Sequence, residues 1–340
     1  MTIARALRLA ITEEMRRDPT VICIGEDIGI PGGWGGAFTV TWGLEREFGL
    51  ERIRNTPISE AGLIGAAVGA ALTGLRPIAD FQYSDFMFCA ADQLINQAPK
   101  ICFMSGGRLK VPLVVRAPVG ASTRGAQHAQ CPEAWIMHTP GWKVAVPATP
   151  YDAKGLLKAA VRDDNPVFIF EHKLLYGSSG ARKEDNAVQV DEPVPDEDFV
   201  VPFGSAVIRR PGKDITVIAT HLMLYRALQA AEELAQTGIE LEVIDPRTLV
   251  PFDYDTVCES LGRTGRLMIV EEDTRRGGWG AEIVAEIAEK HRDLLKSPPV
   301  RVATHDAPIA ASPVMERFAV PDAARVAAAA RAMLGHRASE

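Results

Sequence analysis

One run of small residues constrains this chain more than any other segment. After Ile58 and Ser59, a single carboxylate, Glu60, opens an apolar stretch in which small residues recur at every fourth position, namely Gly62, Ala66, Ala70 and Gly74. In an α-helix these positions lie along one side, and each glycine costs about 1 kcal/mol against alanine in a helix interior. Such a side cannot fill a core by itself.

Two structures can explain this run. The first is an ordinary helix buried in the core of its own domain. The second is a helix that packs closely against a symmetry mate or a partner chain and carries a buried glutamate, Glu60, to a ligand. The second is favoured because this many glycines require an offsetting contact with another backbone.

Length, charge and cysteine usage narrow the class of protein. The chain has 340 residues, and single cores stop growing near about 250–300 residues, so two domains are expected. A net charge of −7 argues against nucleic acid as the main partner. No apolar run approaches the roughly 18–20 residues of a membrane span, and the first residues lack a signal-peptide profile. The cysteines are scattered without zinc-like spacing, so we expect reduced thiols and a cytoplasmic protein.

Apolar strands alternate with amphipathic helices, which predicts two parallel-sheet α/β domains. In the first half we expect strands over 21–25, 76–81, 111–116, 143–147 and 166–171, and helices over 3–18, 86–104 and 152–162 beside the Glu60 helix. In the second half we expect strands over 214–220, 240–244, 266–271 and 300–303, and helices over 225–237, 253–261 and 281–291. The predicted division is a domain over 1–178, an acid- and proline-rich linker over 179–203, and a smaller domain over 204–340.

Two local patterns invite a functional interpretation. The glycine-rich loop at residues 29–36 lacks the Lys-Ser/Thr ending of a P-loop, so a tight turn is favoured over a phosphate site. His128 follows a buried strand, where open α/β sheets bind ligands, although a loop histidine is ordinarily a solvated or capping side chain. A nucleophile pair of His128 with Cys131 is disfavoured, because no third orienting group is evident.

Several segments together resemble the beta subunit of the thiamine-diphosphate-dependent, decarboxylating component of 2-oxo acid dehydrogenase complexes, a family that includes pyruvate, branched-chain and acetoin enzymes. The resemblance runs along nearly the whole chain and is carried by residues 25–27, 56–62, 74–78, 126–128, 150–157 and 171–176. It implies a pyrimidine-binding α/β domain followed by a transketolase C-terminal-like α/β domain. It also implies an oxidoreductase that acts on an oxo group with lipoamide as acceptor, and only as an alpha/beta complex.

The resemblance assigns roles to individual residues. In the family, the glutamate that matches Glu60 hydrogen-bonds a pyrimidine ring nitrogen of thiamine diphosphate, the electron sink for loss of carbon dioxide. Ile58 matches a backbone contact to the cofactor, Phe86 an aromatic residue stacked on the pyrimidine, and Gln82 a pocket position. His128 matches the histidine that donates a proton or positions the acyl group during transfer to lipoamide.

The resemblance also implies partners. The family's alpha subunits hold the diphosphate through Mg²⁺ with a Gly-Asp-Gly motif, which is absent from these 340 residues. The chain is therefore expected to form half of a site, completed by an alpha subunit in a heterotetramer that contains a second beta subunit and meets a lipoyl acyltransferase core. Some members hold a structural K⁺, for which the matching residues are Leu113, Ala160, Val161, Asp163 and Asn165.

The sequence leaves the substrate open among pyruvate, acetoin and branched-chain 2-oxo acids, because its motifs resemble all three groups. Two other classes of function also stay open. One is a non-catalytic α/β nucleotide-binding or assembly module. The other is a self-sufficient transketolase-like enzyme, which the missing Gly-Asp-Gly disfavours.

Overall fold

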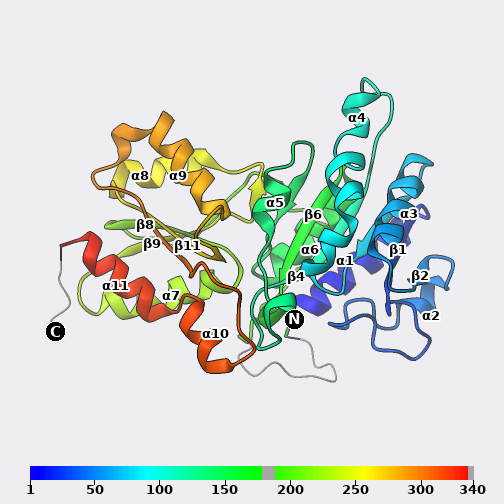
Figure 1. Ribbon diagram of the computed structural model, residues 1–340, viewed down its shortest axis with the longest axis horizontal. Helices are drawn as coiled ribbons and strands as arrows, with labels where there is room; N and C mark the ends of the chain where they lie inside the picture. The colour runs from blue at the N-terminus through cyan, green and yellow to red at the C-terminus, as the bar shows by residue number, and fades with distance from the viewer. Residues whose placement is uncertain (178–187, 336–340) are drawn as a thin grey trace.

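The computed structural model describes residues 1–177 and 188–335, which form two sheets flanked by helices (Figure 1). The first sheet has the strand order β10-β5-β6-β4-β3-β1-β2, and the second has the order β12-β11-β8-β9-β7. Neighbouring strands are parallel except at two edges, where β10 and β7 run antiparallel to their neighbours. The prediction of two mostly parallel α/β domains is confirmed.

The strands are short, as is usual in α/β domains. The first sheet contains β1 (Val21–Glu26), β2 (Ile53–Thr56), β3 (Arg76–Asp80), β4 (Val114–Val119), β5 (Lys143–Ala145), β6 (Val167–His172) and β10 (Thr248–Val250). The second contains β7 (Val207–Arg210), β8 (Ile215–Ala219), β9 (Leu241–Asp245), β11 (Leu267–Thr274) and β12 (Val300–Thr304).

Helices join most of these strands. Those of the first half are α1 (Ile3–Arg17), α2 (Leu44–Phe48), α3 (Glu60–Leu72), α4 (Ile101–Met104), α5 (Glu133–Met137) and α6 (Pro150–Arg162). Those of the second half are α7 (His221–Ala235), α8 (Tyr254–Thr264), α9 (Trp279–Lys290), α10 (Pro313–Ala319) and α11 (Ala323–Met333). Short 3-10 or π turns are η1 (Ser84–Ala90), η2 (Gln93–Gln97), η3 (Ala126–His128), η4 (Lys173–Leu175) and η5 (Arg292–Leu294).

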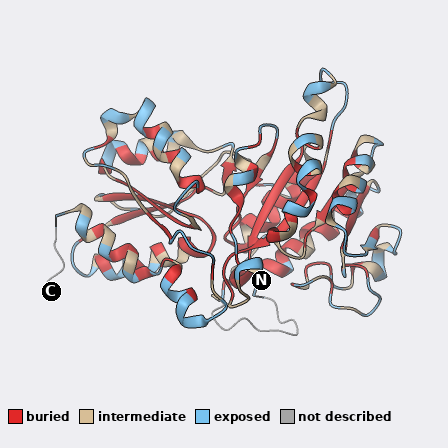
Figure 2. Cartoon of the chain, in the orientation of Figure 1, coloured by how far each residue is buried: buried red, intermediate tan, exposed pale blue. Residues whose placement is uncertain are grey.

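Successive side chains of the central strands enter two different cores. Ile78 and Ile169 belong to the core that contains α1 and α6, whereas Ala79 and Phe168 belong to the core that contains α3. This alternation follows from the two-residue period of a strand. Figure 2 shows the result, with buried strands between helices that are exposed on their outer sides. The all-apolar strands of the sequence are thus buried on both faces, as in other parallel sheets.

The continuous helix predicted over residues 86–104 is wrong. The structure has a 3-10 segment in η1, a π turn in η2 and only a short α4 there. In η2 the amide of Ala98 donates to the carbonyl of Gln93 at 2.9 Å, and the following Pro99 has no N–H with which to continue a regular ladder. Strands β2, β7 and β10 and helices α2, α5, α10 and α11 were not predicted.

The two halves of the chain are joined by a shared sheet edge and a buried ion-pair group. β10 belongs to the second half but pairs with β5, with Thr248 opposite Ala145. Asp152 of α6 is fully buried, and its carboxylate pairs with Arg209 and, at 2.8 Å, with Arg247. These contacts fix the second sheet against the first.

Residues 188–203, the described part of the predicted linker, form no helix or strand. They run over α6, where the amide of Val201 donates to the carbonyl of Gly155 at 3.1 Å. The proposed division at residues 178 and 204 stays a prediction, and residues 179–187 of the linker lie outside the described residues. Among the described helices, none has the length and apolar character that crossing a bilayer would require.

Arg116 of β4 holds the ends of three neighbouring strands together. Its Nε donates to the carboxylate of Glu171 in β6 at 2.8 Å, and its Nη1 donates to Asp80 at the end of β3. The hydroxyl of Tyr176 donates to the same Glu171 at 2.6 Å. Burial raises the pKa of Asp80 to about 6, and the charge of Arg116 acts in the opposite direction. The guanidinium therefore compensates the buried carboxylate of Glu171 and the half-buried carboxylate of Asp80.

We expect Arg116→Met to lower the free energy of unfolding by about 3–5 kcal/mol, because the buried Glu171 and the half-buried Asp80 would be left without their cation. Urea unfolding of the isolated chain, followed by circular dichroism, measures this loss. The matched control is Arg16→Met, which removes an exposed arginine paired with exposed Glu47 and should change stability little. An equal loss in the two variants would contradict the role given to Arg116.

Candidate functional site

The candidate site lies at the edge of the first sheet where β1, β2, β3 and β4 have their carboxyl ends. These strands are parallel neighbours, so Glu26 at the end of β1 lies opposite Thr56 at the end of β2, and Gly25 lies opposite Asp80 of β3. Glu60 follows β2, Gln82 and Phe86 follow β3, and His128 follows β4. The topology therefore brings the four predicted site residues that act through side chains to one edge, where α/β sheets bind ligands.

Glu60 is the first residue of α3, and its side chain is half-buried. No hydrogen bond or ion pair engages its carboxylate within the described part of the chain. Burial raises the pKa of neighbouring Glu26, and the charge of Glu60 adds to this effect. In the single chain one side of α3 is uncovered and Glu26 lies nearby, so the expectation of a glutamate buried against a partner chain stays a prediction. Ile58, the expected backbone contact, is 82% exposed.

Helix α3 has one buried side and one exposed side of different composition. The buried residues are Leu63, Ile64, Ala67, Val68 and Ala71. The exposed residues are Ala61, Gly62, Ala66 and Gly69. A Cβ built on Gly69 meets no atom within 4 Å, and one on Gly65 meets only Gln93 at an ordinary 3.7 Å. Packing within this chain therefore does not require glycine at either position.

In the glycine-rich loop at residues 29–36, unlike in α3, packing within the chain does require a glycine. Gly35 has a φ of +73°, and a Cβ at this position would lie 2.0 Å from the backbone nitrogen of Trp42. Glycine is therefore required at position 35 by the close approach of the chain's own backbone.

The stretch from Gln82 to Phe86 links the Glu60 region to His128. The side-chain amide of Gln82 donates to the carbonyl of Glu26 and to the carboxylate of Asp27, each at 3.3 Å. Phe86 is half-buried, and its ring centroid lies 5.4 Å from that of His128 at an interplanar angle of 89°. The structure thus places Gln82, Phe86 and His128 in one continuous region with Glu60 at its border.

The turn η3 that carries His128 is held from several sides. The ammonium of Lys173 donates to the His128 carbonyl at 2.6 Å. The amide of Gln130 donates to Asp85 at 3.3 Å, and the carbonyl of Gln130 accepts from Gly120 at 3.2 Å.

Burial raises the pKa of the Cys131 thiol well above its ordinary value. The thiol therefore stays protonated, which does not support a nucleophile pair with His128.

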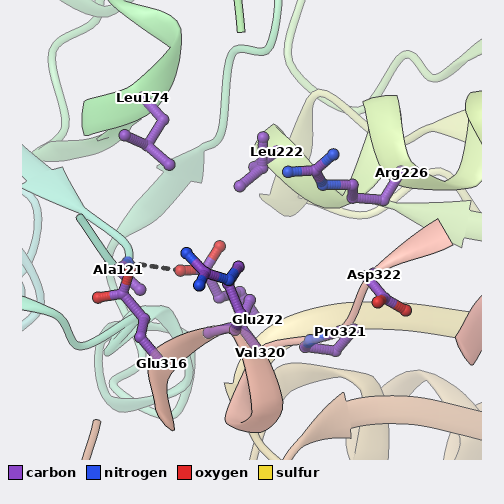
Figure 3. Close-up of a pocket in the computed structure, with 10 residues that line it drawn as sticks. Ala121, Leu174, Leu222, Arg226, Glu272, Glu316, Val320, Pro321 and Asp322 are labelled. Carbon is purple, nitrogen blue, oxygen red and sulfur yellow. Dashed lines mark hydrogen bonds between the residues drawn. The ribbon is translucent and has the colours of Figure 1, made fainter. Parts of the chain in front are cut away.

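A cavity of about 250 Å³ lies between the two halves, with Ala121 and Leu174 of the first half and Leu222 of the second among its lining residues (Figure 3). In it, Glu272 of β11 accepts from the amide of Ala121 at 2.6 Å and contacts His172 Nε2 at 2.8 Å. The amide of Leu174 donates to His172 Nδ1 at 3.2 Å, so we assign the imidazole proton to Nε2. Burial lowers the pKa of His172, which agrees with a neutral imidazole that donates to a charged Glu272.

A second cavity of about 550 Å³ opens beside the His128 turn, with Gln127, Gln130 and Asp273 among its lining residues. Burial, reinforced by the charges of Glu133 and Glu271, raises the pKa of Asp273 to about 8. The raised pKa favours the protonated form of this carboxyl, which can donate a hydrogen bond.

The five predicted potassium residues gather at the opposite, amino-terminal edge of the first sheet. Leu113 directly precedes β4, and the other four (Ala160, Val161, Asp163 and Asn165) lie between the end of α6 and β6. Arg76 Nη1 donates to the carbonyls of Val161 and Asp163, each at 2.9 Å. The Asp163 carboxylate pairs with Lys143. In the described chain, no three His, Cys, Asp or Glu side chains are arranged to hold a metal ion.

Comparison with known proteins identifies the family. Residues 1–179 match the model of the transketolase pyrimidine binding domain, and residues 204–326 match that of the transketolase C-terminal domain. The beta subunit of acetoin:2,6-dichlorophenolindophenol oxidoreductase from Cupriavidus necator is 44% identical over 97% of this chain and 96% of its own length. The pyruvate dehydrogenase E1 beta subunit of Rhizobium meliloti is 44% identical, over 98% of this chain and 70% of its own.

The chain belongs to the beta-subunit family of 2-oxo acid and acetoin dehydrogenase E1 components. A third relative, the 2-oxoisovalerate dehydrogenase beta subunit of Bacillus subtilis, is 42% identical over 97% of this chain and 98% of its own. A split-gene transketolase described as an inactive β4 tetramer shares the fold, with a TM-score of 0.77, 22% identity and 99% coverage of both chains. As an E1 beta subunit the chain is an oxidoreductase component, and its domains support thiamine diphosphate as the cofactor.

The sequence did not predict three residues that the structure places in the site region of this E1 beta subunit. Glu26 lies beside Glu60, Tyr83 contacts the rings of Phe86 and His128, and Lys173 holds the His128 carbonyl. Glu26 had a detectable signal, because a polar residue directly after a buried strand marks the carboxyl edge of a sheet. Lys173 lies 45 residues from His128, and no local pattern indicates their contact.

Proposed function

We propose that this chain and an alpha subunit form a thiamine-diphosphate enzyme that decarboxylates a 2-oxo acid, or cleaves acetoin, and acylates the lipoyl group of an acyltransferase core. The observation that carries the proposal is the unengaged carboxylate of Glu60 at the start of a helix with an exposed glycine and alanine side. A carboxylate in this position is free to accept a hydrogen bond from a ligand. The relatives named above include pyruvate, acetoin and 2-oxoisovalerate enzymes at similar identity, so the proposed substrate is this class.

The residues at the sheet edge fit the pyrimidine half of the cofactor. Thiamine diphosphate, when bound, supplies the electron sink that decarboxylation requires. Glu60 would accept a hydrogen bond from the pyrimidine, Ile58 would contribute a backbone contact, and Phe86 would offer an aromatic face. Gln82, fixed by Glu26 and Asp27, would line the pocket. An exposed Ile58 supports a site that is closed only when a second subunit covers it.

His128 would donate a proton or position the acyl group during transfer to lipoamide. Its imidazole lies edge-on to both Tyr83 and Phe86, at 4.8 and 5.4 Å between ring centroids, so its orientation is restrained. The cavity beside its turn gives the neighbouring residues Gln127 and Gln130 access to solvent.

The diphosphate half requires the partner. We propose that an alpha subunit with Gly-Asp-Gly holds Mg²⁺ and the diphosphate, since this chain contains no such motif. The exposed side of α3 supports a close subunit contact, because glycine and alanine allow two backbones to approach. A second beta subunit and the acyltransferase core complete the proposed assembly, which we place in the cytoplasm on the basis of five free cysteines.

The expected effect of Glu60→Gln in the co-expressed complex is a loss of kcat of about 10²- to 10⁴-fold, because the cofactor would lose its charged hydrogen-bond acceptor. Assembly, measured by size-exclusion chromatography with light scattering, should be unchanged. Glu51→Gln, at an exposed position before β2, is the matched control and should leave turnover unchanged. Full turnover of the Glu60→Gln complex would refute the role of Glu60.

Gly69→Ala should have opposite effects on the isolated chain and on assembly. It should raise the free energy of unfolding of the isolated chain by about 0.5–1 kcal/mol, since alanine is the better helix former and Gly69 has open space around it. It should also weaken association with the alpha subunit, because the added methyl group projects from the exposed side of α3. Urea unfolding and light scattering measure the two effects.

The control for Gly69→Ala is Gly262→Ala in α8, where a Cβ also meets no atom within 4 Å. This control should stabilise the chain to a similar degree and leave association unchanged. If Gly69→Ala associates as the wild type does, the exposed side of α3 is not the subunit contact.

We also propose a structural K⁺ near the carbonyls of Leu113, Ala160, Val161, Asp163 and Asn165, as in related enzymes. Carbonyl oxygens have two lone pairs, so those that face Arg76 retain one for a hard cation. Thermal unfolding should then have a higher midpoint in KCl than in choline chloride at equal ionic strength. Identical midpoints in the two salts would contradict a potassium site.

A further inference from the structure

Lys173 is a buried lysine directly beneath the turn that carries His128. It is the first residue of η4, at the end of β6, and only 2% of its surface is exposed. Taking an ammonium out of water costs several kcal/mol unless it is paired and hydrogen-bonded. A lysine in this position therefore needs partners that compensate its charge.

The partners of Lys173 belong to the His128 region. Its Nζ donates to the His128 carbonyl at 2.6 Å and lies 5.2 Å from the centroid of the Tyr83 ring. Burial lowers the pKa of Lys173 to about 8, and the charge of Asp85 is the largest opposing influence. Asp85 in turn accepts from the amide of Gln130 at 3.3 Å. Lys173 and Asp85 thus hold the same turn at two points.

The turn has little internal support of its own. η3 comprises three residues, with one backbone hydrogen bond from the amide of His128 to the carbonyl of Gly125 at 3.0 Å. Short 3-10 turns have poor hydrogen-bond geometry. The direction of the His128 side chain therefore depends on contacts from outside the turn, and those contacts are Lys173 on its carbonyl and the rings of Tyr83 and Phe86.

We propose that Lys173 is a positioning residue, whose ammonium fixes the His128 carbonyl and so orients the imidazole against Tyr83 and Phe86 for the acyl-transfer step. The proposal rests on the function proposed for His128 above. Lys173 itself reaches only the backbone of His128, so it acts through that residue.

A double-mutant cycle separates positioning from a merely structural role. Lys173→Met, His128→Ala and the double variant are prepared as co-expressed complexes, and kcat and KM are measured for reductive acylation of free lipoamide. Since a displacement of about 1 Å can cost on the order of 10²-fold in rate, we expect Lys173→Met to lower kcat by that order and leave KM unchanged. In the His128→Ala background the same substitution should cause no further loss.

Two further variants complete the design. Lys173→Arg keeps a positively charged donor and should retain most of the wild-type kcat. Lys290→Met removes an exposed lysine at the end of α9 and should have wild-type kcat and KM. Should Lys173→Met fail to assemble, Lys173→Gln, which removes the charge and keeps polarity, replaces it in the same cycle.

The outcomes distinguish the inference from the function on which it rests. The positioning role is supported if His128→Ala and Lys173→Met each lower kcat to a similar degree and the double variant is no slower than His128→Ala alone. A slow His128→Ala complex with additive losses, or with wild-type kcat in the Lys173 variant, overturns it and leaves the function of His128 intact. Wild-type kcat in His128→Ala refutes the proposed function of His128, and the positioning role fails with it.

Discussion

Arg116 of β4 lies between the half-buried carboxylate of Asp80 and the buried carboxylate of Glu171, which belong to the two flanking strands, and the candidate site depends on this group. Its guanidinium ties β3, β4 and β6 together at the edge from which the loops carrying Gln82, Phe86 and His128 begin. Removing one member of such a buried group leaves uncompensated charge in the core. The loops of the site can therefore be irregular, because the strand ends beneath them are fixed.

The second constraint acts outside the single chain. Helix α3 buries its larger aliphatic residues against the first sheet and leaves glycine and alanine outward. A helix that served only this chain would be more stable with alanine at Gly69, where nothing is within 4 Å. The glycines therefore indicate a close partner, and Glu60 at the start of the same helix would be covered by that partner. One helix thus links assembly to the proposed chemistry.

The fold could be predicted from the sequence because all-apolar strands bounded by glycine and proline alternate with amphipathic helices. The irregular segment from Ser84 to Met104 could not, since its 3-10 and π turns are selected by tertiary packing and by Pro99. β10 is only three residues long and pairs with β5 across about 100 residues of chain, which no local pattern indicates.

The site could be predicted where its residues lie in a local pattern, and could not where they meet only through the fold. Glu60 and His128 follow strands and carry a family motif, whereas Lys173 and Tyr83 join the site only through long-range contacts. Glu60 is half-buried in the single chain, and in the proposed complex the surface that would cover it belongs to another polypeptide.

The central claim is that this chain supplies one half of a cofactor site and its partner supplies the other. Isothermal titration of thiamine diphosphate in the presence of Mg²⁺, into the isolated chain and into the co-expressed alpha/beta complex, tests it most directly. We expect saturable binding to the complex and none to the isolated chain. Equal binding to both would show a complete site in this chain, and absence of binding to the complex would indicate an assembly module without this chemistry.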